Sequence, residues 1–124
     1  MKRAVESPGA PKPVGPYSQA IVTSDYVFLS GLIPITVEGD LIKGDVRSQF
    51  ETIMQNARAI LEQAGSSLDK VLKVTVFMTD LSRFDEMNRV YAEFFRSPYP
   101  SRTTIQVSSL PKGAEIEIEI LAHL

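Results

Sequence analysis

The stretch DVRSQFETIMQNARAILEQAG, residues 45–65, decides the fold class because it carries the clearest helical pattern in the chain. Its apolar residues recur at intervals of three and four, as expected for a helix with one buried face. Asp45 or Gly44 can cap its start, and Gly65 can adopt the left-handed conformation that ends many helices. The apolar face comprises Val46, Phe50, Ile53, Met54, Ala57, Ile60, Leu61 and Ala64. This stretch therefore predicts an amphipathic helix that packs on another element.

Runs of β-branched and aromatic residues flank this helix and predict strands. On its N-terminal side, strands are expected over residues 18–23 and 26–34, and none before residue 18. A turn at residues 38–40 leads to a short strand around 41–42. On the C-terminal side, a strand is expected over residues 71–78.

A second amphipathic helix is predicted after the strand at 71–78. Ser82 and Asp85 have the spacing of a capping box, in which a serine and an acid three residues later cap a helix start. Pro98 and Pro100 end the helical pattern, because proline disrupts a helix interior. The apolar face of this helix comprises Phe84, Met87, Tyr91, Phe94 and Phe95.

The last quarter of the chain combines one arginine with a row of acids. Strands are expected over residues 100–107 and 114–119, and we expect them to pair, so that Arg102 faces the carboxylates of the second strand. Arginine grips small carboxylates through two parallel hydrogen bonds, which suggests a pocket for an acidic metabolite. The alternative is an exposed arginine beside a solvated acidic face, and these residues alone favour that alternative.

The order of strands, helix, strand, helix and two strands predicts an α+β fold, a mixed sheet with two helices on one face, in a single domain over residues 1–124. Within residues 26–33, apolar side chains occupy both the odd and the even positions, which point to opposite faces of a strand. The second face of the sheet therefore also needs a cover. The chain has no further element to supply one. We therefore expect copies of the same chain to cover it, in a symmetric oligomer with pockets between subunits.

Composition excludes several classes of function. The 124 residues include no cysteine and a single histidine, His123, so a cysteine nucleophile, a Ser/His/Asp triad and a metal site are not expected. No glycine-rich motif for phosphate or dinucleotides is present. A net charge of −2 without a basic run makes nucleic acid an unlikely partner. Without a membrane-spanning segment or secretory signal, we expect a cytoplasmic protein.

Five short motifs follow one another along nearly the whole chain. They are Gly15-Pro16-Tyr17-Ser18-Gln19-Ala20, Ser30-Gly31 with Pro34, Asn88-x-x-Tyr91-Ala92-x-Phe94-Phe95, Pro100-x-Arg102, and Leu110-Pro111-Lys112 with Glu117-Ile118-Glu119. Each motif is weak alone, but in this order and at these separations they closely resemble the RidA (YjgF-like) family of reactive-intermediate imine deaminases. The resemblance implies a chorismate-mutase-like α+β fold, assembled as a homotrimer with the sheets forming a central barrel and the helices outside.

The resemblance also implies an activity. Family members hydrolyse 2-iminobutanoate and 2-iminopropanoate, which pyridoxal-phosphate enzymes release, to 2-keto acids and ammonia. The implied sites lie in clefts between neighbouring subunits, and the implied partners are a small 2-imino or 2-keto acid and other copies of the chain. No cofactor and no metal are implied.

Carried onto this chain, the resemblance assigns roles to particular residues. Arg102 matches the arginine that holds the substrate carboxylate, and Glu117 matches the acid that orients the attacking water and moves its proton. Gly31 corresponds to the backbone group that meets the ligand. The other residues implied to bind substrate are Tyr17, Ser30, Asn88 and Thr104. From the residues alone, Tyr17 is as readily a packing aromatic, and Asn88 a helix-surface amide.

Thr104 departs from the family pattern, because some relatives carry a cysteine at this position. The resemblance implies that this position acts mainly through its backbone, so hydrolysis should survive the change. Regulation through a thiol at this position is not expected.

Two other functions remain open at the level of the sequence. A non-catalytic module that senses 2-keto acids could use the same cleft, because gripping a carboxylate does not require turnover. Ribonuclease or translation-inhibitor activity has been attributed to some relatives. The negative net charge and the missing basic stripe argue against it here.

Overall fold

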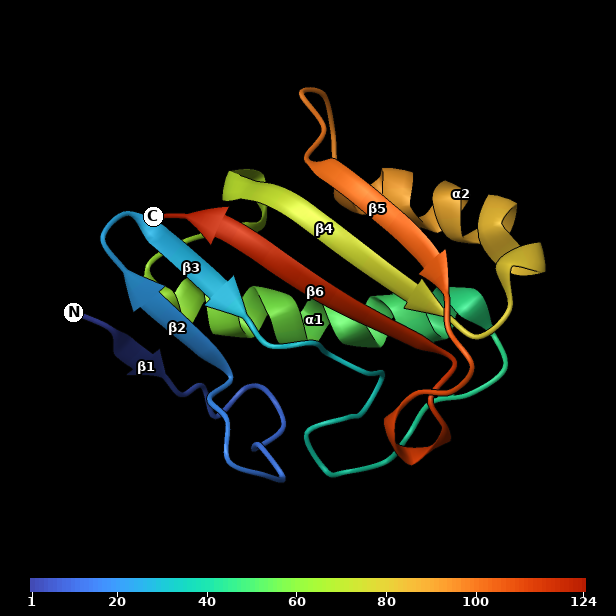
Figure 1. The fold of residues 1–124 in the computed structure, drawn as a ribbon, viewed down its shortest axis with the longest axis horizontal. Coiled ribbons are helices and arrows are strands. Elements are labelled where there is room, and N and C mark those ends of the chain that lie inside the picture. Colours follow the sequence, from blue (N-terminus) through green and yellow to red (C-terminus); the bar gives the residue numbers. More distant parts are fainter.

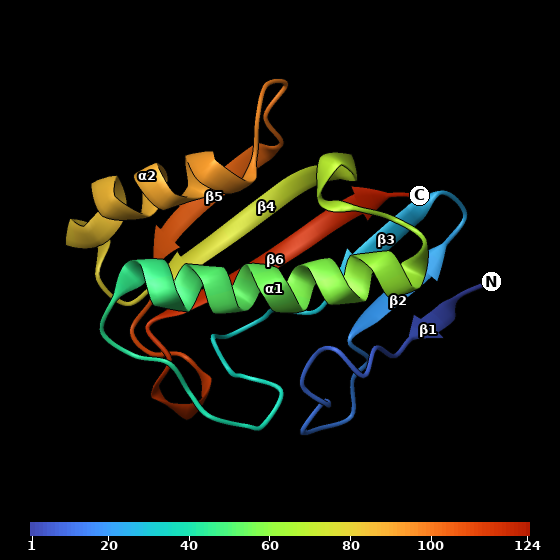
Figure 2. The same ribbon diagram turned by 180° about the vertical axis from the view of Figure 1, so that it is seen from behind.

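The computed structural model describes all 124 residues and contains a six-stranded sheet with both helices on one face (Figures 1 and 2). The strands are β1 (Arg3–Val5), β2 (Ala20–Thr23), β3 (Tyr26–Leu29), β4 (Val71–Met78), β5 (Ser101–Gln106) and β6 (Ile116–His123). The helices are α1 (Val46–Ala64) and α2 (Phe84–Phe94), with short 3-10 turns η1 (Leu68–Lys70), η2 (Leu81–Arg83) and η3 (Pro111–Gly113). The sheet order is β1-β2-β3-β6-β4-β5, and only β4 and β5 run parallel. The predicted α+β fold with a mixed sheet is confirmed.

Helix α1 forms as its sequence predicts. The Asp45 side chain accepts a hydrogen bond from the Ser48 backbone N–H at 3.1 Å, and Gly65 ends the helix in the left-handed region with φ 91°. All eight predicted apolar residues are buried, together with Gln49 and Asn56. Full burial of a side chain such as Phe50 contributes about 1.5–3 kcal/mol, so this face holds the helix on the sheet.

Neither helix is long and apolar enough to cross a membrane.

The start of α2 differs from the prediction. The expected capping box at Ser82 and Asp85 is wrong, because the Asp80 carboxylate accepts the Ser82 backbone N–H at 2.9 Å. That bond begins the turn η2, and α2 follows from Phe84 without a side-chain cap. Asp85 lies in the first turn of α2, where its charge favours the positive end of the helix dipole.

The predicted pairing of the last two strands is wrong. β4 lies between β5 and β6, parallel to β5 and antiparallel to β6. Parallel neighbours need a long crossover, and η2 and α2 supply it between β4 and β5. The final strand then returns to the middle of the sheet, between β3 and β4.

The N-terminal half contains one strand that was not predicted and several that are shorter than predicted. β1 pairs with β2, and β2 begins at Ala20 rather than at residue 18. β3 ends at Leu29, after which Leu32 rejoins the sheet through two backbone hydrogen bonds with Ile118, at 2.8 and 2.9 Å. The short strand expected near 41–42 is reduced to an isolated bridge between Ile35 and Leu41.

The face of the sheet opposite the helices has no cover within the chain (Figure 1). Its exposed apolar residues include Tyr26, Phe28 and Ile105, which are 46%, 45% and 40% accessible. We refer to this surface as the open face; cross-strand neighbours share a face, and the register also places Thr75 and Glu117 on it. The uncovered face expected from the sequence is therefore present.

Candidate functional site

The structure divides the predicted site residues between the two faces of the sheet. Arg102 lies opposite Val74, which is fully buried beneath the helices. Glu117 lies opposite Phe77, which follows Val74 by three residues on β4. Glu117 and Phe77 both point to the open face. The expectation that Arg102 faces the acids of the last strand is therefore wrong within one chain. β4 separates the two strands, and the alternation of side chains sends Arg102 and Glu117 in opposite directions.

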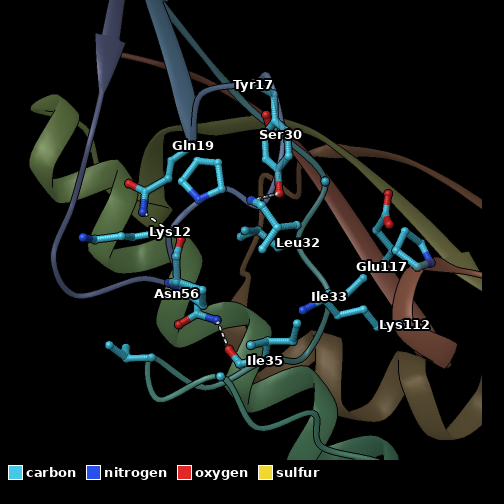
Figure 3. A pocket seen from close by; sticks show the side chains of 17 residues that line it. Lys12, Tyr17, Gln19, Ser30, Leu32, Ile33, Ile35, Asn56, Lys112 and Glu117 are labelled. Atoms are coloured by element: carbon cyan, nitrogen blue, oxygen red, sulfur yellow. Dashed lines mark hydrogen bonds between the residues drawn. The ribbon is translucent and has the colours of Figure 1, made fainter.

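The first group of predicted residues lines a cavity of about 230 Å³, which we call the Glu117 pocket (Figure 3). Its walls come from residues 11–19, residues 30–39, the middle of α1 and the turn η3 with the start of β6. Four predicted residues line it: Tyr17, Ser30, Gly31 and Glu117. Four polar residues that were not predicted also line it: Lys12, Gln19, Asn56 and Lys112. The pocket therefore combines one carboxylate with apolar and cationic walls.

The Glu117 carboxylate packs directly against Gly31. A Cβ on Gly31 would lie 2.9 Å from Glu117 Cδ and 3.3 Å from Glu117 Cγ, so a side chain at this position would displace the acid. Burial raises the pKa of Glu117 above its usual 4.5, and the negative charge of Glu119 raises it further. A carboxyl group with a raised pKa in a pocket is suited to exchange protons with a bound molecule.

Gln19 fixes the loop that carries Tyr17. This side chain is 5% exposed; its amide nitrogen donates to the carbonyls of Pro11, Ser7 and Ala10 at 2.9, 3.2 and 3.4 Å. Its oxygen accepts the Ser7 backbone N–H at 2.6 Å. The loop is therefore ordered by one buried amide. The sequence signal for this role was the single amide side chain, Gln19, near the start of the strand predicted over residues 18–23. This signal was missed.

The other walls of the pocket are tied by hydrogen bonds as well. The Ser30 hydroxyl donates to the Ser18 carbonyl at 2.6 Å, which ties the segment after β3 to the segment before β2. The Asn56 side chain donates to the Ile35 carbonyl at 2.7 Å. The Tyr17 hydroxyl accepts the Val14 backbone N–H at 3.4 Å, and 51% of this residue is exposed. Tyr17 and Gly31 are therefore exposed in this group, whereas Ser30 and Glu117 are partly buried.

The second group surrounds Arg102 between β5 and α2. The Arg102 guanidinium carbon lies 4.7 Å from the centroid of the Tyr91 ring and 5.6 Å from that of Phe84. Its side chain is partly buried and forms no salt bridge in the chain. Asn88 and Thr104, both predicted, each contribute a buried side-chain oxygen without a hydrogen-bond partner. Arg102, Asn88 and Thr104 thus provide one positive charge and two polar atoms without hydrogen-bond partners.

Glu115 has a structural role that differs from the solvated acid expected beside Glu117. Its carboxylate accepts the Gly44 backbone N–H at 2.9 Å and the Gln49 amide at 3.0 Å. Arg83 lies 3.9 Å away. Glu115 therefore anchors the start of α1 to the start of β6, while Glu119 remains exposed.

Known proteins match this chain over almost its whole length. The family model described as Endoribonuclease L-PSP matches residues 7–124. A RutC family protein of Pyrococcus horikoshii is 47% identical, over 99% of this chain and 98% of its own. A protein of Dermatophagoides farinae named 2-iminobutanoate/2-iminopropanoate deaminase is 40% identical, over 95% of this chain and 93% of its own.

Solved structures match equally well. YyfA of Yersinia pestis, described as a protein of the Rid family, superposes with a TM-score of 0.96 at 40% identity, with complete coverage of both chains. TdcF of E. coli, solved with bound serine, superposes with a TM-score of 0.92 at 38% identity and covers 98% of each chain. The chain therefore belongs to the Endoribonuclease L-PSP family, also known as the RidA or YjgF family.

Proposed function

We propose that this protein hydrolyses small 2-imino acids, such as 2-iminobutanoate and 2-iminopropanoate, to 2-keto acids and ammonia. The observation that carries this proposal is the Arg102 guanidinium, which is partly buried on aromatic rings without an acidic partner in the chain. A charge removed from water without a partner is costly, so this site favours an anionic ligand. The planar fork of arginine fits a carboxylate in particular.

A second copy of the chain completes the site in this proposal. Arg102 and Glu117 point to opposite faces of one sheet, so a small acid cannot touch both within one chain. Association through the open face would bury Tyr26 and Phe28 and would bring the pocket of one copy toward the Arg102 of the next. We propose a homotrimer with the sheets inward as a barrel, as the resemblance implies.

The mechanism uses a charge, a carboxylate and water. The substrate carboxylate docks on Arg102, while the backbone at Gly31 and near Thr104 orients the imine. Glu117 of the neighbouring copy takes a proton from water as the water oxygen bonds to the imine carbon. The same carboxyl group passes this proton to nitrogen, which gives a carbinolamine. Glu117 then takes the hydroxyl proton of the carbinolamine and returns it to nitrogen as the carbonyl forms and the carbon–nitrogen bond breaks, so that ammonia and a 2-keto acid leave. The raised pKa of Glu117 suits these proton transfers.

The test follows imine decay while a dehydratase generates 2-iminobutanoate from threonine, with and without this protein. Arg102→Ala removes a charged hydrogen-bonding group worth about 1.5–3 kcal/mol, so kcat/KM should fall about 10- to 150-fold. Arg89→Ala is the matched control, because Arg89 is an exposed arginine on α2. Sedimentation should show the same assembly for both variants. Undiminished turnover by Arg102→Ala would refute the assigned role.

A non-catalytic sensor of 2-keto acids is the second candidate. The E. coli relative with bound serine supports small amino-acid-like ligands for this fold without requiring turnover. Binding of 2-ketobutanoate without faster imine decay would favour a sensor. Ribonuclease activity, which the description of the family model names, is disfavoured by the net charge of −2. Salt-sensitive cleavage of RNA by a rigorously purified sample would revive it.

A further inference from the structure

We propose that Tyr91 is a positioning residue that holds the Arg102 guanidinium ready for a carboxylate. This inference rests on the proposed function, because the group that Tyr91 positions is the proposed substrate anchor. The ring lies 4.7 Å beneath the guanidinium carbon, closer than Phe84 at 5.6 Å. Neither the sequence motifs nor the comparisons assign this residue a role.

Arg102 needs such a support because no salt bridge in the chain fixes its charged end. It lies on β5, an edge strand of the sheet, and no acid forms an ion pair with it. A free arginine side chain samples many rotamers, and ordering it on binding weakens affinity. An aromatic ring attracts the cation without using its N–H groups. The ring can therefore hold Arg102 while the N–H groups of the guanidinium stay available to a ligand. A carboxylate partner within the chain would occupy those N–H groups.

Tyr91 is itself held rigidly by other aromatic residues. Its ring packs edge-on to Phe50, with centroids 6.0 Å apart, and against Phe95 at 4.7 Å. Only 6% of Tyr91 is exposed, whereas Phe84 is less buried. Since Phe50 is fully buried in the core, Tyr91 links the position of Arg102 to the most rigid part of the protein.

The hydroxyl of Tyr91 gives independent evidence that the ring borders a ligand site. Buried tyrosine hydroxyls ordinarily find a hydrogen-bond partner, but this one has none in the chain. The side-chain oxygens of Asn88 and Thr104 are buried and unpartnered in the same way. The pKa of Tyr91 is raised by burial, and the nearby positive charge of Arg102 opposes that rise. Three unused polar atoms therefore lie on α2 and β5, the two elements that hold the Arg102 cation, as expected where a polar ligand binds.

Titration of 2-ketobutanoate into the wild type and three variants tests this role. Tyr91→Leu should weaken binding about 3- to 30-fold, because it removes the ring beneath Arg102. Tyr91→Phe keeps the ring and should bind within about twofold of the wild type. Phe94→Leu is the matched control, since it removes another aromatic ring of α2 that packs on Phe50, at 5.6 Å, and does not lie over Arg102, so binding should stay near that of the wild type. Wild-type affinity in Tyr91→Leu, or equal losses in Phe94→Leu and Tyr91→Leu, would overturn the inference.

A second readout needs neither ligand nor a folded leucine variant. Protons on Arg102 Cδ should show upfield ring-current shifts by NMR in the wild type and in Tyr91→Phe. Random-coil shifts in the wild type would overturn the inference. If the wild type fails to bind 2-ketobutanoate while these shifts are present, the proposed function fails and the positioning by Tyr91 stands.

Discussion

Replacing Gly31 with alanine should displace the Glu117 carboxylate without unfolding the protein. The new Cβ would lie 2.9 Å from Glu117 Cδ and 3.3 Å from Cγ, and a carboxylate oxygen would be closer still. Unstrained contacts between carbon atoms lie at about 3.5–4.0 Å, so the carboxylate must move by about 1 Å. Gly31 is not among the glycines with a left-handed φ, so alanine adds a steric conflict but no backbone strain.

The expected loss of activity in Gly31→Ala follows from how far the Glu117 carboxylate moves. Misplacing a catalytic group by about 1 Å can cost about 10²-fold in rate, so kcat/KM of Gly31→Ala should fall by about two orders of magnitude. Stability should change little, because the obstacle is the end of a flexible side chain. Alanine also restricts the unfolded chain, which contributes about 0.4–1 kcal/mol in favour of folding at compatible sites.

A double-mutant cycle shows whether this loss passes through Glu117. The imine-decay assay is run on Gly31→Ala, Glu117→Gln and the combined variant. Once Glu117→Gln has removed the carboxylate, Gly31→Ala should have almost no further effect. Gly9→Ala is the control for crowding elsewhere, since its Cβ would lie 3.1 Å from the Ala59 Cβ. Full activity in Gly31→Ala, or the same loss in both backgrounds, would refute the reasoning.

Three further outcomes are expected. Glu117→Gln should raise the free energy of unfolding at neutral pH, because burial raises the folded pKa of this acid and penalises only its ionised form. Urea titrations should show this gain in stability vanishing below about pH 4. Asp45→Ala should lower the thermal midpoint at neutral pH; the loss should shrink as the pH falls below 3.8, since hydrogen bonds from Ser48 lower the pKa of Asp45. Phe28→Lys on the open face should give a smaller species in sedimentation.

Each of these outcomes can fail in a distinct way. A gain for Glu117→Gln that persists at pH 3 would show that the ionised carboxylate is not its source. A pH-independent loss in Asp45→Ala would mean that the charge of the cap is irrelevant. An unchanged sedimentation coefficient for Phe28→Lys would show that the open face is not buried between copies.

The sequence predicts α1 almost completely because the determinants of that helix are local. Its cap at Asp45, its apolar period and Gly65 all lie within the helix and its ends. The partners of β5 and β6 could not be predicted in the same way, because the sheet order depends on contacts far apart in the chain. β1 was missed since three residues, Arg3–Val5, carry too little pattern to predict a strand.

The same limit applies to the candidate site. The motifs predicted Arg102 and Glu117 as site residues, but only the register with β4 shows that these residues point to opposite faces. Gly31 was expected to meet a ligand through its backbone, and the structure adds that its missing side chain makes room for Glu117. Tyr91 was predicted as an apolar residue on a helix face. Its place beneath Arg102 depends on the packing of α2 against β5, which periodicity does not specify.

Mixing two impaired variants tests the central claim most directly. Arg102→Ala and Glu117→Gln are unfolded together in equal amounts, refolded and assayed for imine decay. If each site takes its arginine from one copy and its acid from the next, random assembly into closed rings restores about one quarter of the wild-type sites. We predict that the mixture regains about one quarter of wild-type activity, while each variant refolded alone keeps its own lower activity. A mixture no more active than the mean of its two components would contradict a site shared between copies.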